Sequence, residues 1–280
     1  METNTSAASR RRILNPGALR RWWFEISYPL ITLVGLILLW QLYIRFRGIP
    51  VWLIPAPTDI ASEFLKSYPT LLKHGIMTTK EIILGFGLAV LVGFPIGIGI
   101  SISSLIERTV YPLLVSTQSF PKSAVAPLLI IWFGFGIMPK VMIAFMISFF
   151  PIVVNTVVGL RSINPDMIQL VRSMGAGALS TFIKVRFPNA LPTIFAGLKT
   201  AMALSVVGAV VGEFVGADQG LGYLILFSQN DLKTKLLFAA LTFVSLIGIG
   251  LFSIVSVLER LFIPWHVSVR KETGSVAESQ

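Results

Sequence analysis

The sequence has no cysteine, only two histidines, and few charged residues of either sign. Without cysteine the chain can form no disulfide, no thiolate metal site and no thiol nucleophile. Charged residues make up 13% of the 280 positions and hydrophobic residues 54%, whereas a soluble domain averages roughly 25% charged residues. A mean hydropathy of +0.80 agrees with this balance. The composition therefore predicts an integral membrane protein with one membrane domain.

Acidic side chains are scarcer than basic ones, 13 against 23, which gives a net charge of +10. A basic chain could bind nucleic acid, but the placement of its basic residues argues otherwise. Basic residues instead gather before the first apolar segment, at Arg10, Arg11, Arg12, Arg20 and Arg21. We interpret this charge as a sign of membrane orientation, with the basic tail in the cytoplasm, and expect no nucleic-acid partner.

The sequence also lacks the Gly-x4-Gly-Lys-Ser/Thr loop that cradles nucleotide phosphates. His74 and His266 lie outside the apolar segments, so a membrane enzyme would have no acid–base or metal-binding partners for chemistry. We therefore expect no catalytic residue, no metal site and no cofactor. Any ATP hydrolysis that serves this protein would take place on another polypeptide.

Six segments are long and apolar enough to cross a bilayer, which takes about 20 mainly apolar residues. Glycine and proline are admitted, as they are in membrane helices. The segments cover residues 28–45, 80–102, 109–132, 140–160, 193–216 and 236–258. The first is followed by Arg45-Phe46-Arg47 rather than by the small residues of a cleavage site, so we expect it to be retained.

The predicted architecture is an all-α, polytopic membrane protein with six transmembrane helices and both termini inside. Residues 1–27 would form a basic cytoplasmic tail, 28–260 the transmembrane domain and 261–280 a second cytoplasmic tail. Glycines recur four residues apart in two of the spans, which favours close packing of helices. These glycines are Gly93 and Gly97, and Gly208, Gly212 and Gly216.

The internal loop 161–192 is amphipathic and basic, unlike the spans beside it. Asn164 can cap a helix whose first turn suits Pro165. Gly175 is expected to end this helix, because glycine adopts the left-handed backbone of a helix stop. A second short helix would run from about Ser180 and stop at Pro188. The loop is thus predicted to form a knob of two short helices joined by a tight bend.

This loop resembles the cytoplasmic signature of the membrane subunits of ATP-binding-cassette importers. That signature is Glu-Ala-Ala, three residues, Gly, nine residues, then Ile-x-Leu-Pro, and the chain meets its spacing with different residue types at several positions. Gln169 stands where the family has an acidic residue, which puts an ionic contact there in doubt. The resemblance implies an ATPase-coupling role for Gln169, Leu170, Val171, Arg172, Gly175, Ala176, Val185, Phe187 and Pro188.

The resemblance extends over about 54–266 and is strongest to the branch that serves sulfonates, taurine, nitrate and pyrimidine precursors. Within that branch the chain is most similar to permeases for hydroxymethylpyrimidine-like and riboflavin-like substrates. The stretches that carry this similarity are 54–57, 126–136, 208–216 and 220–225.

What the resemblance implies is the type I importer permease fold in the bacterial inner membrane. The chain would pair with a second copy of itself in the lipid bilayer. Two cytosolic ATP-binding subunits would bind the two knobs, and an extracytoplasmic substrate-binding protein would deliver a small polar substrate. That substrate would be a vitamin or vitamin precursor, such as riboflavin or hydroxymethylpyrimidine, or an anion of the sulfonate, taurine or nitrate type.

Polar residues inside the predicted spans are candidates for the translocation pathway. Glu213 is taken as the only carboxylate in a span, and a pathway role and a buried contact to a neighbouring helix are about equally favoured. For Gln118 and Asn155, hydrogen bonds between helices are favoured over substrate contact. A secondary transporter or channel is the alternative function, although it has no need of a docking knob and usually carries several charges within the membrane.

Overall fold

The computed structural model of the chain describes residues 16–264, with side chains from residue 27 onward. The outer parts of the two predicted tails, 1–15 with Arg10, Arg11 and Arg12 and 265–280, lie outside the described residues. Helix α1 begins at Pro16, so the rest of the predicted N-terminal tail is already helical rather than a separate segment.

Between residues 16 and 264 the secondary structure is helical, which confirms the all-α class. Five helices in this range are long and apolar enough to span a membrane: α1, α3, α6, the helix that ends as α9, and α11. The α-helices are α1 (Pro16–Arg47), α2 (Pro57–Lys66), α3 (Tyr68–Ile102), α4 (Ser104–Ser116), α5 (Ala126–Phe133), α6 (Ile137–Arg161), α7 (Pro165–Ser173), α8 (Ala178–Thr181), α9 (Phe187–Gly216), α10 (Leu221–Asn230) and α11 (Thr234–Phe262).

The third predicted span, 109–132, is wrong as a continuous helix. Helix α4 ends at Ser116 and is followed by two short 3-10 turns, η1 (Thr117–Ser119) and η2 (Lys122–Val125), before α5 begins. The break lies at Phe120, which has extended backbone angles (φ −83°, ψ 128°). Phe120 precedes Pro121, and a residue before proline is driven out of the helical region by the proline ring. The count of six crossings therefore stays a prediction.

The centre of the bundle is formed by α3, α6 and α9, whose backbones approach closely at small residues. A side chain added at Gly85 of α3 would lie 2.5 Å from the Ala144 Cβ, and one added at Gly208 of α9 would lie 2.6 Å from the Ala144 Cα. Glycine is needed at both positions because α6 passes between the two helices at this level. This confirms the packing role of the glycine ridge that includes Gly208.

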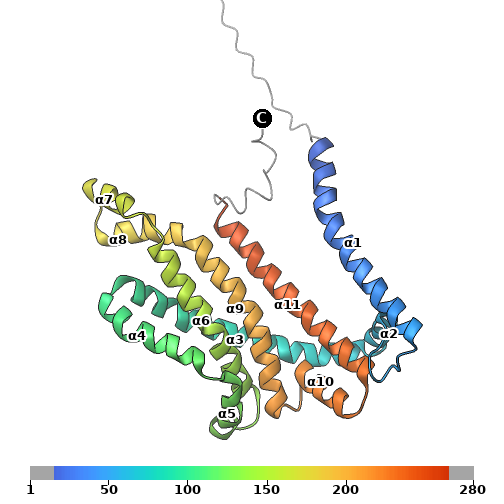
Figure 1. Ribbon diagram of the computed structural model, residues 1–280. Coiled ribbons are helices and arrows are strands. Elements are labelled where there is room, and N and C mark those ends of the chain that lie inside the picture. The colour runs from blue at the N-terminus through green and yellow to red at the C-terminus, as the bar shows by residue number, and fades with distance from the viewer. Residues whose placement is uncertain (1–15, 265–280) are drawn as a thin grey trace, which may run out of the picture.

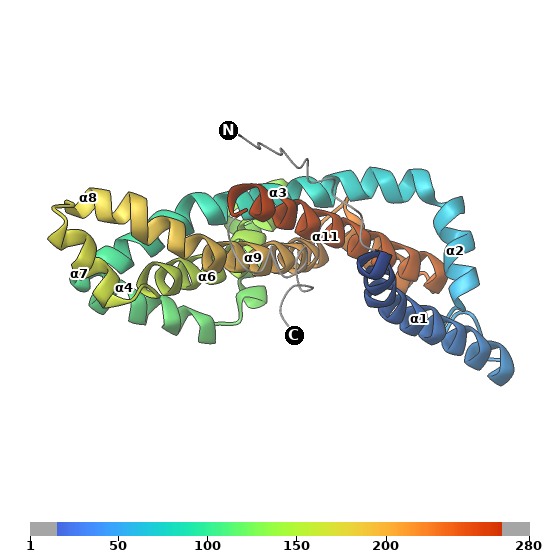
Figure 2. The same cartoon turned by 90° about the horizontal axis from the view of Figure 1, so that it is seen from above.

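The bundle presents different features at its two ends (Figure 1). Helices α7 and α8 project at one end, and the first turns of α1 and the last turns of α11 point toward the same upper side of the view. Helices α5 and α10 lie at the opposite end. Seen from above, α1 and α2 stand apart from α7 and α8 across the length of the molecule (Figure 2). The start of α1 and the end of α11 thus lie on the same side as the knob, while the orientation in a membrane stays a prediction.

Candidate functional site

The first half of the predicted knob is the short helix α7. The Asn164 side chain accepts a hydrogen bond from the Asp166 N–H at 2.9 Å, and Pro165 occupies the first turn. The Asn164 side chain satisfies one free N–H group of the helix start, and Pro165 has none to satisfy. The predicted cap is therefore present at the start of α7.

Gly175 makes the bend that follows α7. Its φ of +86° lies in the left-handed region that residues with a side chain avoid. The Ala176 N–H donates to the Val171 carbonyl at 3.2 Å and closes the helix end. A side chain at Gly175 would meet nothing within 4 Å. Glycine is thus required by the backbone angle alone, whereas Gly177 next to it has an ordinary φ of −68°.

The second half of the knob does not stop at Pro188, and that prediction is wrong. Helix α8 continues through a π-helical turn, η3 (Phe182–Arg186), directly into α9. In this turn the Phe187 N–H donates to the Phe182 carbonyl, five residues back. The wider turn accommodates Pro188, which has no N–H and whose ring would collide with a carbonyl of a regular helix. The second half of the knob is therefore continuous with a long helix that could span a membrane.

The predicted coupling residues fall into two groups. Gln169, Leu170, Arg172 and Gly175 are exposed on the knob. The other five are half-buried: Val171, Ala176, Val185, Phe187 and Pro188. Of these, Phe187 packs against Leu160, Ala190 and Ile194, and its ring lies 6.2 Å from that of Phe94.

The exposed surface of the knob is unusually apolar for a projection that touches little of its own chain. Five large hydrophobic side chains are more than half exposed there: Met167 (56%), Leu170 (63%), Met174 (79%), Leu179 (71%) and Ile183 (55%). Contiguous exposed apolar side chains with a polar surround mark surfaces that bind other proteins or membranes. Taken alone, the chain therefore leaves these five apolar side chains of the knob uncovered.

Arg161, the last residue of α6, fixes the base of the knob. Its guanidinium donates to a carboxylate oxygen of Glu107 in α4 and, at 3.0 Å, to the Ile100 carbonyl near the end of α3. The hydrogen bond from Arg161 holds the pKa of the Glu107 carboxyl below its ordinary value. A motion of the knob relative to the α3–α4 corner would strain these contacts.

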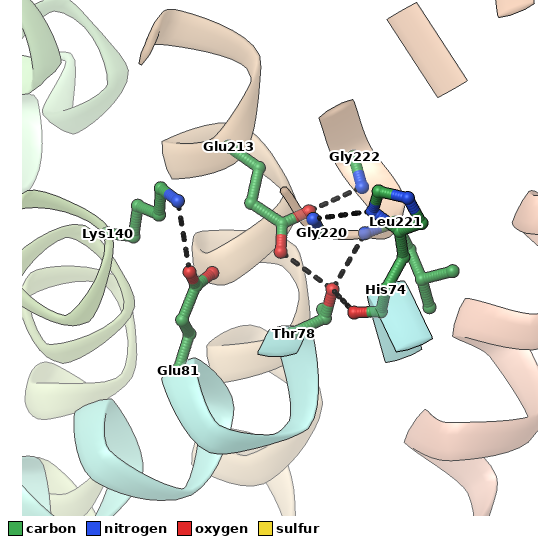
Figure 3. A network of polar contacts seen from close by, with 8 residues as sticks. All are labelled: His74, Thr78, Glu81, Lys140, Glu213, Gly220, Leu221 and Gly222. Atoms are coloured by element: carbon green, nitrogen blue, oxygen red, sulfur yellow. Dashed lines mark hydrogen bonds and ion pairs between the residues drawn. The ribbon is translucent and has the colours of Figure 1, made fainter. Parts of the chain in front are cut away.

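Glu213 lies near the other end of the bundle and is only 1% exposed. The Thr78 hydroxyl donates to its Oε1 at 2.6 Å, and the Gly222 N–H donates to its Oε2. The Leu221 N–H donates to the Thr78 hydroxyl at 2.8 Å and the Gly220 N–H to His74 Nδ1 at 3.0 Å (Figure 3). Side chains of α3 and α9 therefore cap the first N–H groups of α10, where Gly220 has no side chain to do so.

Two further charged residues adjoin Glu213, and sequence reasoning missed both. Lys140 of α6 and Glu81 of α3 form an ion pair at 3.2 Å (Figure 3), with residue exposures of 2% and 0%. The expectation that Glu213 is the only carboxylate in a span is therefore wrong. Glu81 falls inside the predicted span 80–102, so its position alone could have revealed it. Lys140 is the first residue of the predicted span 140–160, and its burial against Glu81 depends on the packing of α6 on α3.

The three predicted pathway residues have different partners. Gln118 lies exposed in η1, and the Lys122 ammonium donates to its side-chain oxygen. Asn155 is half-buried in α6, and its amide donates to the Pro151 carbonyl of the same helix at 2.9 Å. Glu213 belongs to the buried cluster at the start of α10. A pathway role for each of them stays a prediction.

Comparison with known proteins gives a consistent result. Residues 85–265 match the family model described as binding-protein-dependent transport system inner membrane component. The chain is 36% identical over 248 residues to the riboflavin transport system permease protein RibX of Chloroflexus aurantiacus, covering 88% of this chain and 92% of the relative. It is 34% identical over 244 residues to the formylaminopyrimidine transport permease protein ThiX of Halalkalibacterium halodurans, covering 87% and 97%. It is 26% identical over 253 residues to the taurine transport system permease protein TauC of Escherichia coli, covering 88% and 92%.

Among solved structures, the chain is similar to a structure of the MetNI methionine ABC transporter in an inward-facing conformation. The TM-score is 0.59 at 19% identity, covering 69% of this chain and 96% of the other. At this identity the similarity supports only a shared fold. It confirms the type I importer permease fold that the sequence predicts.

Proposed function

The chain belongs to the family of inner-membrane components of binding-protein-dependent transport systems, and on this basis we propose that it is the membrane-spanning half of an ATP-driven importer. Two copies would enclose the pathway. Two cytosolic ATP-binding subunits would bind the two knobs, and an extracytoplasmic binding protein would deliver the substrate on the opposite face. Both termini would lie in the cytoplasm.

The observation that carries this proposal is the exposed apolar surface of the knob, in a chain of this family. Leu170, Met174 and Leu179 are among the most exposed hydrophobic side chains of the knob. A cleft on an ATP-binding subunit would bury them from water, and each such side chain contributes about 1.5–3 kcal/mol when fully buried. The contact would depend on shape and apolar area, since Gln169 supplies no charge.

The continuity of α8 with α9 suggests how closure of the ATP-binding subunits would reach the pathway. Because no flexible loop separates them, a displacement of the knob would turn α9 as a lever about its contacts with Phe94 and Leu160. The far end of α9 carries Glu213, which is bonded to the start of α10. Alternating access would follow from this motion in two facing copies.

For the substrate we propose a small polar molecule, with a vitamin or a pyrimidine-type vitamin precursor ahead of a sulfonate, taurine or nitrate-type anion. The support is the higher identity to the riboflavin and formylaminopyrimidine permeases, 36% and 34%, than to the taurine permease, 26%. Uptake of radiolabelled riboflavin, formylaminopyrimidine and taurine into cells that express the whole system would decide among them.

The coupling role can be tested with two adjacent glycines. Gly175→Ala places a side chain at a φ of +86°, whereas Gly177→Ala places one at −68°. We expect Gly175→Ala to weaken co-purification of the ATP-binding subunit and to lower ATP-dependent uptake several-fold, because the backbone must rearrange at a cost of about 1–2 kcal/mol. Gly177→Ala should behave like the wild type. Uptake that proceeds equally well without ATP would instead favour a secondary transporter.

The proposed orientation has its own test, made simple by the absence of cysteine. Ser173→Cys on α7 and Ser62→Cys on α2 replace exposed serines with a thiol of similar size. Ser173→Cys should react with an impermeant thiol reagent from the cytoplasmic side only, and Ser62→Cys from the outside only. The reverse pattern would contradict the placement of the knob in the cytoplasm.

A further inference from the structure

The break between α4 and α5 exposes a run of mostly polar residues. Residues Ser116 to Pro121 are six consecutive exposed positions. Four of them, Ser116, Thr117, Gln118 and Ser119, have polar side chains, and the half-buried Lys122 follows. We call residues 117–122, which comprise the 3-10 turn η1, the extended break at Phe120 and the start of η2, the unwound segment.

The unwound segment lies level with the middle of a membrane-spanning helix. Just before it, Leu114 packs in a cluster with Val153 of α6. Just after it, Val125 and Ala126 pack in a cluster with Ile143 of α6. Helix α6 runs from Ile137 to Arg161, so these contacts bracket its central turns. The segment therefore sits at about the mid-depth of the bundle, along the edge formed by α4 and α5 (Figure 1).

Irregular backbone at this depth cannot face lipid. Hydrocarbon offers no hydrogen-bond partners, and an unsatisfied peptide group there costs several kcal/mol, so irregular segments occur within membranes only against protein or water. The Lys122 ammonium adds a positive charge at the same depth, where charged residues usually line ion or substrate routes. Its donation to the Gln118 side-chain oxygen leaves it further N–H groups for another acceptor.

We propose that the unwound segment lines the translocation pathway, with a second copy of the chain completing the wall. Lys122 and the neighbouring hydroxyl groups then bind oxygen acceptors of the passing substrate, either carbonyl or anionic oxygens. This inference rests on the proposed role as a paired permease. It assigns a pathway role to Gln118 together with Lys122, which donates to it.

The absence of cysteine allows the lining to be measured without knowing the substrate. Ser119→Cys places a thiol three residues from Lys122 on exposed backbone. In membranes containing the assembled transporter, the thiol is reacted with anionic methanethiosulfonate ethylsulfonate and with cationic methanethiosulfonate ethyltrimethylammonium. Both rates are normalised to those of a free thiol. Leu39→Cys, on a residue of α1 that is 64% exposed and lies in an apolar stretch, is the control for a lipid-facing site.

We expect Ser119→Cys to be labelled and Leu39→Cys to remain unlabelled. The anionic reagent should react faster, and adding Lys122→Met should reduce the ratio of the anionic to the cationic rate by about tenfold, as one unit charge within several Å implies in a hydrated site. Lys122→Arg should restore the ratio, which shows that the loss is not due to misfolding. No labelling of Ser119→Cys, or a ratio unaffected by Lys122→Met, would overturn the proposal. Neither result bears on whether the knob binds an ATP-binding subunit, since these reactions need no ATP.

Discussion

The knob at one end of the bundle and the buried cluster around Glu213 at the other are both polar interruptions of an apolar chain, yet they are built in opposite ways. The knob is held by local contacts, such as the Asn164 cap, and leaves Met174 79% exposed. The cluster joins residues from α3, α6, α9 and α10 and leaves Glu81 with no exposed surface. A contact surface must be available to a partner, whereas buried charges must be satisfied within the fold.

This contrast predicts where substitutions destabilise the protein and where they only weaken its contact with the ATP-binding subunit. The largest effect is expected at Lys140, which provides the positive charge opposite Glu81 at 3.2 Å. Lys140→Met leaves the buried carboxylates of Glu81 and Glu213 without a positive charge beside them, and should lower the free energy of unfolding by about 3–5 kcal/mol. The double variant Lys140→Met/Glu81→Gln should recover most of this loss, as measured by thermal unfolding of the purified complex. No recovery would show that the ion pair is not what Lys140 contributes.

The next effect concerns Glu213 and separates its two interpretations. Glu213→Ala removes the acceptor of the Thr78 hydroxyl and of the Gly222 N–H, and should cost about 2–4 kcal/mol because both donors stay buried. Glu213→Gln keeps the size of the side chain and one carbonyl oxygen, so we expect smaller losses of stability and near-normal uptake. If Glu213→Gln retained wild-type stability but abolished uptake, the pathway role would be favoured instead.

A smaller effect is expected in the knob itself. Asn164→Ala removes the side chain that accepts from the Asp166 N–H and should cost about 1 kcal/mol, confined to α7. The thermal midpoint of the bundle should hardly change, while the affinity for the ATP-binding subunit falls about fivefold. Hydrogen exchange of α7 together with a binding titration measures both. Asn164→Asp keeps a cap and is the matched control; a drop in the midpoint as large as that of Lys140→Met would contradict the separation of the two regions.

The smallest expected effect is the response of the knob base to acid. The pKa of Glu107 is lowered by the hydrogen bond from Arg161, so its contribution is present above the ordinary carboxyl pKa and is lost as the pH falls through the lowered value. Acid should therefore loosen the α4–α6 contact at the base. Hydrogen exchange of residues near Arg161 should rise on acidification in the wild type, and Glu107→Gln should show the raised exchange already at neutral pH. Identical exchange in both proteins at neutral pH would exclude this role.

The same contrast explains what could be predicted from the sequence. The bend at Gly175 and the cap at Asn164 follow from neighbours within a few residues, so the pattern indicated them correctly. The cluster depends on residues as far apart as Thr78 and Glu213, which are brought together only by helix packing. The break at Phe120 was missed because hydropathy averages over a window and the effect of Pro121 on its neighbour was not weighed. The π-turn before Pro188 was missed because proline was treated only as the end of a helix.

The central claim, that the knob binds an ATP-binding subunit, is tested most directly by site-directed chemical cross-linking from the cysteine-free chain. Met174→Cys places a thiol at the bend of the knob, where the side chain is 79% exposed, and Phe135→Cys places one near the α5 end of the bundle, where it is 83% exposed. With a short bifunctional thiol-to-amine reagent in cell membranes, we expect Met174→Cys to give one product that contains a polypeptide with a nucleotide-binding motif, identified by mass spectrometry. Phe135→Cys should give no such product. The same product from both positions, or from Phe135→Cys alone, would contradict the assignment of the knob.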